Sequence, residues 1–160
     1  MKEILPIFWL LYMALMSLTT QAKQADVMEI EAVFAAYMDK YNDYLRHGEL
    51  TNKTQLYHDK MMVLSGRSGA AVTSANKFNE QVKGFLDNLK KQGVTRVSWE
   101  KVGIQQLSDS VAIVSNRAVR YLKTGEVHNR VGATYFINKV GGSWKISAFT
   151  VHSPNTVLPI

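Results

Sequence analysis

The sequence contains no cysteine and only three prolines. Without cysteine, the chain has no disulfide framework, no lipidated cysteine behind a signal segment and no thiol nucleophile. It also lacks a proline-rich linker, an internal repeat and a low-complexity tract, which indicates one folded domain. A length of 160 residues and a hydrophobic content of 46% are typical of a globular protein with its own core.

The longest apolar run lies at the N-terminus. It spans Ile4 to Leu18 and leads into Thr20-Gln21-Ala22, where small residues stand at the two positions that a signal peptidase reads. The run is shorter than the roughly 20 residues that a bilayer span needs. We therefore predict a secretory signal peptide over residues 1–22, with an uncleaved membrane anchor as the alternative. Cleavage would leave a periplasmic or secreted protein without a stable membrane span.

Basic residues outnumber acidic ones, and the net charge is +6. Such a charge can favour an anionic partner. The basic residues are scattered along the chain, however, and Lys90-Lys91 is the one adjacent pair. A solvated basic surface is the better interpretation, and we expect no nucleic-acid partner.

Apolar spacing divides the remaining chain into a helical first half and a strand-rich second half. A helix is predicted from Asp26, with Glu29 completing a capping box, to Gly48. A second helix is predicted from Ser74 to Gly93, and a short strand at 61–64. Four strands with a two-residue period follow at 96–107, 111–122, 126–138 and 144–152. This order favours an α+β fold with an antiparallel sheet covered on one face.

Turn residues predict how the strands pair. Lys123-Thr124-Gly125 suits a three-residue loop with glycine in the left-handed conformation, and Gly141-Gly142 suits a two-residue loop. Counting from the first loop places Arg117 opposite Val131. Counting from the second places His152 opposite the same valine.

Both counts predict one set of residues that faces the helices: Val111, Ile113, Ser115, Arg117, Val119 and Tyr121; Val127, Asn129, Val131, Ala133, Tyr135 and Ile137; Ile146, Ala148, Thr150 and His152. Arg117 and His152 would lie roughly 10 Å apart in one row, with Asn129 diagonal to both. A buried arginine needs a negative or strongly accepting partner, either a helix carboxylate or a ligand. The apolar phase flips within strand 96–107, which predicts a bulge there.

With these elements in place, the chain resembles the nuclear transport factor 2-like superfamily, also called SnoaL-like or cystatin-like α+β. The resemblance rests on the order of elements and on the closing GGSWKISAFTVHSP, with its glycine pair, Trp144, Ile146 and His152-Ser153. It implies a domain at 24–154 followed by a C-terminal tail at 155–160. It also implies a bent sheet packed against the N-terminal helices, with a cone-shaped pocket between them. Because members include enzymes and binding domains, the resemblance implies no particular reaction.

The candidate ligand-binding residues are Arg117, Asn129, Tyr135, His152 and Tyr37. We prefer a small-molecule-binding domain with an anionic or carbonyl-bearing ligand, because the predicted inward strand positions contain no carboxylate to act as a base. Each residue also has a structural interpretation. A strand-end histidine is often a partly exposed hydrogen-bonding residue, an inward arginine can form a structural ion pair, and a tyrosine on a helical stripe is usually core.

Two alternatives remain open. One is a lyase or isomerase with His152 as general acid or base, oriented by Asp59 near the pocket mouth, and Arg117 stabilising negative charge. The other is a protein-interaction domain whose cavity is filled. The histidines lack metal-ligand spacing, and we expect no metal and no cofactor. The resemblance further implies a homodimer through the outer sheet face, with Phe149 and Val151 supplying apolar contact.

Overall fold

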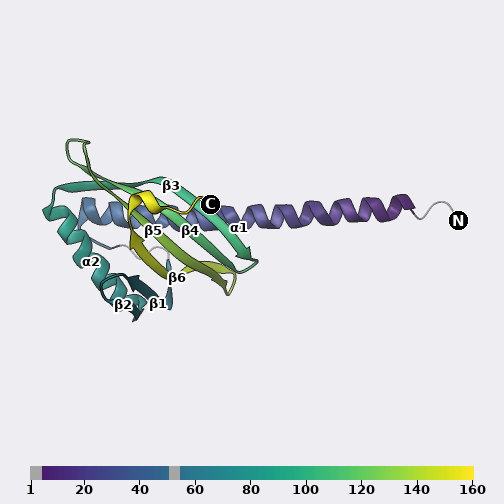
Figure 1. Cartoon of the computed structure of the whole chain (residues 1–160), viewed down its shortest axis with the longest axis horizontal. Coiled ribbons are helices and arrows are strands. Elements are labelled where there is room, and N and C mark those ends of the chain that lie inside the picture. Colours follow the sequence, from purple (N-terminus) through teal and green to yellow (C-terminus); the bar gives the residue numbers. More distant parts are fainter. Residues whose placement is uncertain (1–4, 51–54) are drawn as a thin grey trace.

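The computed structural model describes residues 5–50 and 55–160, with side chains from residue 23 onward. In chain order the elements are α1 (Leu5–His47), β1 (Tyr57–Ser65), β2 (Gly69–Ser74), α2 (Ala75–Lys91), β3 (Val94–Ser108), β4 (Val111–Leu122), β5 (Val127–Val140), β6 (Ser143–His152) and a 3-10 turn η1 (Pro154–Thr156). Figure 1 shows α1 running along the sheet and extending beyond it toward the N-terminus.

Helix α1 is longer than predicted. It begins at Leu5 rather than Asp26, and it includes most of the predicted signal peptide 1–22, whose first four residues lie outside the described residues. No glycine or proline stands between positions 7 and 47 to stop the helix. Within the described residues, no helix has the length and apolar character needed to cross a membrane.

The six strands form one sheet in the order β2-β1-β6-β5-β4-β3. The predicted α+β fold is confirmed, and the four predicted C-terminal strands match β3 to β6 to within two residues. One pair, β1 with β6, is parallel, so the sheet is mixed. Strand β2 was not predicted, because five of its six residues are exposed and it lacks an alternating apolar pattern.

Both predicted hairpin turns are confirmed. Gly125 has a φ of 88°, as a three-residue loop with a left-handed glycine requires. Gly141 and Gly142 have φ values of 61° and 78°, as a two-residue loop requires. The predicted bulge in β3 is also confirmed, since the pairing register shifts between Trp99 and Lys101.

A bulge at His128 of β5, which the sequence analysis did not predict, reverses the facing of β4. Beyond it, Ala118 rather than Arg117 lies opposite Val131. Because successive side chains of a strand alternate between faces, this slip of one residue moves every β4 side chain to the other face. Even-numbered positions from 112 to 120 face the helices, and the prediction for the odd-numbered set, Arg117 included, is wrong.

A second unpredicted bulge, at Ser147 of β6, reverses the end of that strand. His152 lies opposite Gly132 and faces away from the helices, contrary to prediction. Phe149 and Val151 face inward and line a cavity, so they do not supply apolar contact on the outer sheet face. The predicted inward positions of β5 from Val131 onward are correct.

The core lies between α1, α2 and the inward face of the sheet. The predicted stripe of α1 is confirmed, and its buried members are Ile30, Phe34, Tyr37, Tyr41, Tyr44 and Leu45. Helix α2 begins after Ser74, whose side chain accepts a hydrogen bond from the backbone N–H of Lys77, as an N-cap does. Its buried face consists of Phe78, Val82, Leu86 and Leu89.

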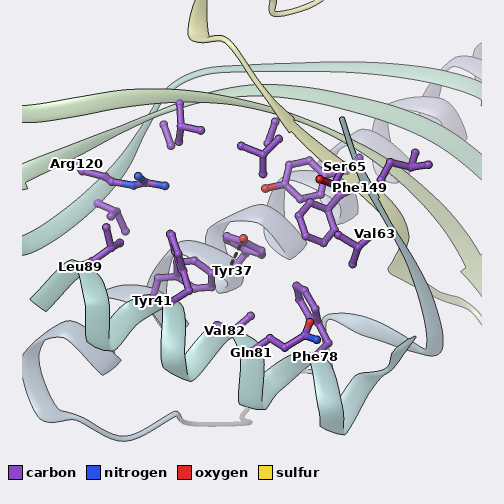
Figure 2. A pocket seen from close by; sticks show the side chains of 18 of the residues that line it. Tyr37, Tyr41, Val63, Ser65, Phe78, Gln81, Val82, Leu89, Arg120 and Phe149 are labelled. Atoms are coloured by element: carbon purple, nitrogen blue, oxygen red, sulfur yellow. Dashed lines mark hydrogen bonds between the residues drawn. The ribbon is translucent and has the colours of Figure 1, made fainter. Parts of the chain in front are cut away.

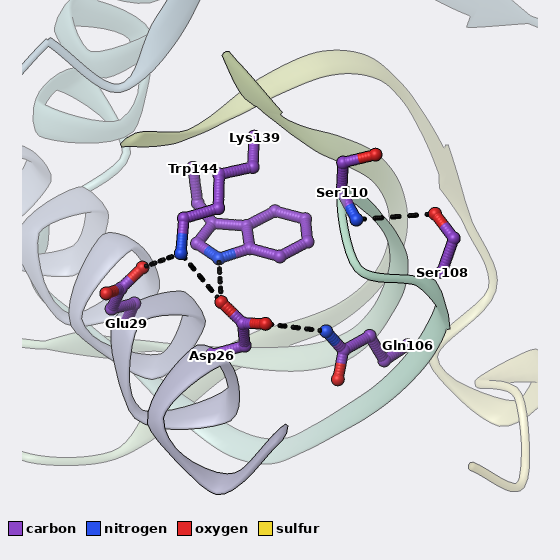
Figure 3. Close-up of polar contacts among 7 residues, drawn as sticks. All are labelled: Asp26, Glu29, Gln106, Ser108, Ser110, Lys139 and Trp144. Atoms are coloured by element: carbon purple, nitrogen blue, oxygen red, sulfur yellow. Dashed lines mark hydrogen bonds and ion pairs between the residues drawn. The ribbon is translucent and has the colours of Figure 1, made fainter. Parts of the chain in front are cut away.

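Asp26 ties α1 to three strands rather than capping a helix as predicted (Figure 3). Because α1 continues past it, its carboxylate is available to the strands. It accepts from Lys139 Nζ at 2.7 Å, from Gln106 Nε2 at 3.0 Å and from Trp144 Nε1 at 3.3 Å. Lys139 Nζ also lies 2.9 Å from Glu29. The hydrogen bond from Lys139 lowers the pKa of Asp26 below its ordinary value of 3.8.

We expect Asp26→Asn to lower the free energy of unfolding at neutral pH by about 1–3 kcal/mol, the cost of losing hydrogen bonds to a charged group. A lowered folded-state pKa stabilises the protein fully above the ordinary value of 3.8 and less as the pH falls below it. The difference in free energy of unfolding between wild type and Asp26→Asn should therefore become smaller below that pH. Urea unfolding from pH 7 to pH 2 measures this difference. A gap independent of pH, or one matched by exposed Asp39→Asn on the same helix, would contradict this role.

Gly132 allows His152 to lie flat on the outer sheet face. A Cβ at this position would lie 2.5 Å from both His152 Nδ1 and the Ser153 carbonyl oxygen. We expect Gly132→Ala to destabilise the protein by about 1–3 kcal/mol through overpacking. The control is Gly84→Ala on exposed α2, where a Cβ meets nothing within 4 Å and about 0.5–1 kcal/mol of stabilisation is expected. Equal melting temperatures for both variants would refute this packing argument.

Candidate functional site

A cavity of about 560 Å³ opens between α1, α2 and the inward face of the sheet (Figure 2). Its position agrees with the predicted pocket. Aromatic side chains from every wall line it: Tyr37, Tyr41, Phe78, Phe85, Trp99, Tyr135 and Phe149. Small side chains on the sheet, Ala118 and Ala133, leave the space open. The protein-interaction alternative predicted a cavity filled by bulky side chains, whereas this cavity is open.

Tyrosines of α1 place hydroxyl groups within this apolar wall. Tyr37 Oη donates to Tyr41 Oη at 2.7 Å, and the two rings stack with centroids 4.4 Å apart. Tyr135 of β5 meets the Tyr37 ring edge-on at 6.0 Å. Burial raises the pKa of Tyr37, Tyr41 and Tyr135 well above their usual range. These hydroxyls therefore stay neutral and can donate or accept hydrogen bonds.

Arg120 of β4 supplies a positive charge to the cavity wall, and Figure 2 shows its guanidinium reaching in from the sheet. It donates to Asn129 Oδ1 at 3.4 Å and lies 5.1 Å from the centroid of the Phe85 ring. Burial lowers the pKa of Arg120, because water is partly removed from the cation. In the part of the chain that the structure describes, no carboxylate pairs with it.

The described lining contains neither a carboxylate nor a histidine. Its other cation is Arg67, an exposed residue in the β1–β2 turn at the rim. Nor do the described residues contain a cluster of three histidine or acidic side chains able to hold a metal ion. The cavity therefore combines apolar rings, neutral hydroxyls and positive charge, a combination suited to an apolar molecule with an accepting or anionic group.

Three of the predicted site residues lie at or beside this cavity. Tyr37 and Tyr135 line it, as predicted. Asn129 does not line it but accepts the hydrogen bond from Arg120 at its edge. Asp59 is exposed on β1 and is absent from the described lining.

Arg117 and His152 lie on the outer sheet face. Arg117 pairs with Glu100 of β3 at 2.6 Å, and Arg130 pairs with the same carboxylate at 3.0 Å. His152 Nε2 is 2.9 Å from Thr134 Oγ1, and its Nδ1 is 2.9 Å from the Ser153 carbonyl oxygen. His152 therefore has the hydrogen-bonding role that the sequence analysis set against its functional one. Arg117 forms a structural ion pair, but on the outer face and with a strand carboxylate rather than inward with a helix carboxylate.

Arg120 is the most consequential of the cavity residues that sequence reasoning missed. The count from the Lys123-Thr124-Gly125 loop assigned it to the outer face, because the bulge at His128 carries no glycine or other local mark. The sequence analysis considered only Arg117 as a buried arginine that needs a negative or accepting partner. The same requirement applies to Arg120, three positions later.

A family model described as NTF2-like protein (DUF6841) matches residues 27–154. The chain belongs to this NTF2-like family. No match was found among curated proteins. The matched segment of this NTF2-like protein contains every wall of the cavity described above.

Solved structures share the fold of this NTF2-like protein. An NTF2-like protein with a cystatin-like fold from Novosphingobium aromaticivorans has 10% identity and a TM-score of 0.60, covering 86% of this chain and 88% of its own. A hexachlorocyclohexane dehydrochlorinase from Novosphingobium barchaimii has 12% identity and a TM-score of 0.58, covering 88% and 94%. The association domain of C. elegans CaMKII has 15% identity and a TM-score of 0.56, covering 81% and 97%. At these identities the likeness shows the fold alone.

Proposed function

We propose that this NTF2-like domain binds a small molecule with an apolar, ring-containing body and one anionic or carbonyl group. The observation that carries the proposal is Arg120, a partly buried cation on the wall of an aromatic cavity, with no carboxylate beside it in the described residues. A cation removed from water is costly unless an anion or strong acceptor meets it. A ligand carboxylate or carbonyl oxygen would supply that partner.

The lining supports binding rather than acid or base chemistry. His152 and Asp59, the pair required by the lyase or isomerase hypothesis, do not line the cavity. The raised pKa values of Tyr37 and Tyr41, caused mainly by burial, keep both hydroxyls protonated at neutral pH, so neither gives up its proton readily and neither supplies a tyrosinate base. The hydroxyls serve instead as hydrogen-bonding groups that orient a ligand.

The proposal places the domain outside the cytoplasm as a homodimer. Export is supported by the apolar run and the small residues before the proposed cleavage site after Ala22. Assembly is supported by a neighbour of the same fold whose name calls it an association domain. The outer sheet face carries the C-terminal segment, where Leu158 N–H donates to Ser115 Oγ at 3.0 Å and Ile160 packs against Gly103. In such a dimer this segment would lie in the interface.

Arg120→Met tests the ligand proposal with a pair of fluorescent dyes. The variant keeps an apolar stem and removes the charge, so we expect binding of anilinonaphthalene sulfonate to weaken by at least about tenfold, as for a lost hydrogen bond to a charged group. Binding of the neutral analogue phenylnaphthylamine should be nearly unchanged. Fluorescence titration of both dyes gives the two dissociation constants.

Two further variants isolate the cavity in this titration. Arg117→Met removes the same charge from the outer face and should leave both dyes bound as in wild type. Ala133→Phe fills the cavity from β5 and should abolish binding of both. Equal loss of the sulfonate in the two arginine variants would refute a specific role for Arg120.

Native mass spectrometry tests export and assembly together. After expression of the whole chain in a bacterium with a periplasm, we expect a periplasmic protein that begins at Lys23 and has twice the mass of one chain. Ala22→Arg should block cleavage, because signal peptidase requires a small residue there. A full-length chain in the membrane fraction, or a mature monomer, would contradict the corresponding half of the proposal.

A further inference from the structure

A second cavity, of about 280 Å³, lies between α1, the start of β1 and the first turns of α2. Its described lining consists of Lys40, Gln55, Leu56, Tyr57, Ala75, Asn76 and Asn79. None of these residues lines the larger cavity, so the two sites are separate. The volume exceeds that of several water molecules at roughly 30 Å³ each.

Lys40 of α1 is buried to an unusual degree for a lysine. Its relative exposure is 5%, and no carboxylate pairs with it among the described residues. Its Nζ donates to Asn79 Oδ1 at 2.7 Å and lies 5.1 Å from the centroid of the Tyr57 ring. Burial lowers the pKa of Lys40, since the charged form has lost water without gaining a counter-ion. Residues 51–54, which lie outside the described residues, have the sequence Thr-Asn-Lys-Thr and include no acid.

The polar groups around Lys40 are left as hydrogen-bond donors. An ammonium has three donors, and one of those on Lys40 is used by Asn79 Oδ1. That bond occupies the acceptor oxygen of Asn79 and leaves its amide NH₂. Gln55 Oε1 is likewise occupied by Lys145 Nζ at 3.2 Å, which leaves the Gln55 NH₂. A site lined by one buried lysine and two amide donors is complementary to an oxyanion.

The N-terminus of α2 adds to the positive electrostatic potential of this cavity. Ala75 and Asn76 are the first two residues of the 17-residue helix, and both line the cavity. The N-terminus of a helix carries partial positive charge and backbone N–H groups that lack partners within the helix. Its contribution has the same sign as that of Lys40, which lies on the facing helix.

We propose that the cavity beside Lys40 binds the oxyanion group of a small molecule, a carboxylate or a phosphate, with Lys40 as its counter-ion and Asn79 as the residue that positions Lys40. Binding would restore a partner to a buried cation. It would also tie α1 to the first turn of α2 and the start of β1.

Isothermal titration at low ionic strength, with inorganic phosphate and acetate as probes, tests this site. We expect at least one probe to bind wild type, and we expect Lys40→Met to weaken that binding by at least about tenfold. Phosphate binding and acetate binding distinguish the two sources of oxyanion. Titration with sodium chloride at the same ionic strength measures the contribution of general screening.

Asn79→Asp provides a second variant that does not rely on removing the buried lysine. Its carboxylate would stand where the Asn79 amide oxygen accepts from Lys40. It should therefore form an ion pair with the Lys40 ammonium in place of a bound anion. We expect it to abolish binding of the probe and to raise the melting temperature. Lys101→Met, at an exposed position on edge strand β3, removes the same charge and should bind as wild type.

The outcomes separate this site from the larger cavity. Arg120→Met should leave phosphate or acetate binding unchanged, and Lys40→Met should leave dye binding unchanged, because the two linings share no described residue. Failure of both probes to bind wild type, retention of binding in Lys40→Met, or an equal loss in Lys101→Met would overturn the proposal.

Discussion

Docking of α1 onto the inward face of the sheet is the constraint on which the rest of the structure depends. The helix is fixed at two places four turns apart. At one, the Asp26 carboxylate accepts hydrogen bonds from strand side chains that include Lys139. At the other, the Asn42 amide exchanges two hydrogen bonds of 2.9 Å with the backbone of Val97. Because β3 is an edge strand, Asn42 satisfies backbone groups that have no neighbouring strand on that side.

This docking gives the larger cavity its rigid wall. Tyr37 lies between the two fixed points and packs against Trp99 and Tyr135, whose ring centroids are 5.7 Å and 6.0 Å from its own. Trp99 Nε1 donates to the Phe34 carbonyl oxygen, so the indole has its polar atom satisfied by the helix and its ring left for the cavity. The α1 side of the cavity is therefore a set of packed rings, and the Tyr37 hydroxyl is held by its hydrogen bond to Tyr41.

The sequence was sufficient to predict most helices and strands, but it was insufficient to predict which face of the sheet each side chain occupies. Periodicity and turn glycines predicted the helices, four strands and both hairpin loops, because these depend on local chemistry. Facing depends on the running count along a strand, and one extra residue reverses it. The bulges at His128 and Ser147 have no local mark, so the count exchanged Arg117 for Arg120 and turned His152 inward. The facing of Tyr135 stayed correct because β5 has no bulge between Val131 and Ile137, so its own alternation holds there.

The placement of acids explains why each cavity contains a cation without a counter-ion. Four acids of the described domain pair with other cations, and none of these ion pairs involves Lys40 or Arg120: Glu100 pairs with Arg117 and Arg130, Asp26 with Lys139, Asp43 with Arg46 and Asp87 with Lys83. At a net charge of +6, some basic side chains must lack an acidic partner, and most of these side chains can stay exposed to solvent. Lys40 and Arg120 are the exceptions because packing has withdrawn them from it. Each therefore destabilises the unliganded fold, and any anion that pairs with either one stabilises the native state by mass action. If the proposed ligands bind, ligand binding and stability are coupled through the same two side chains.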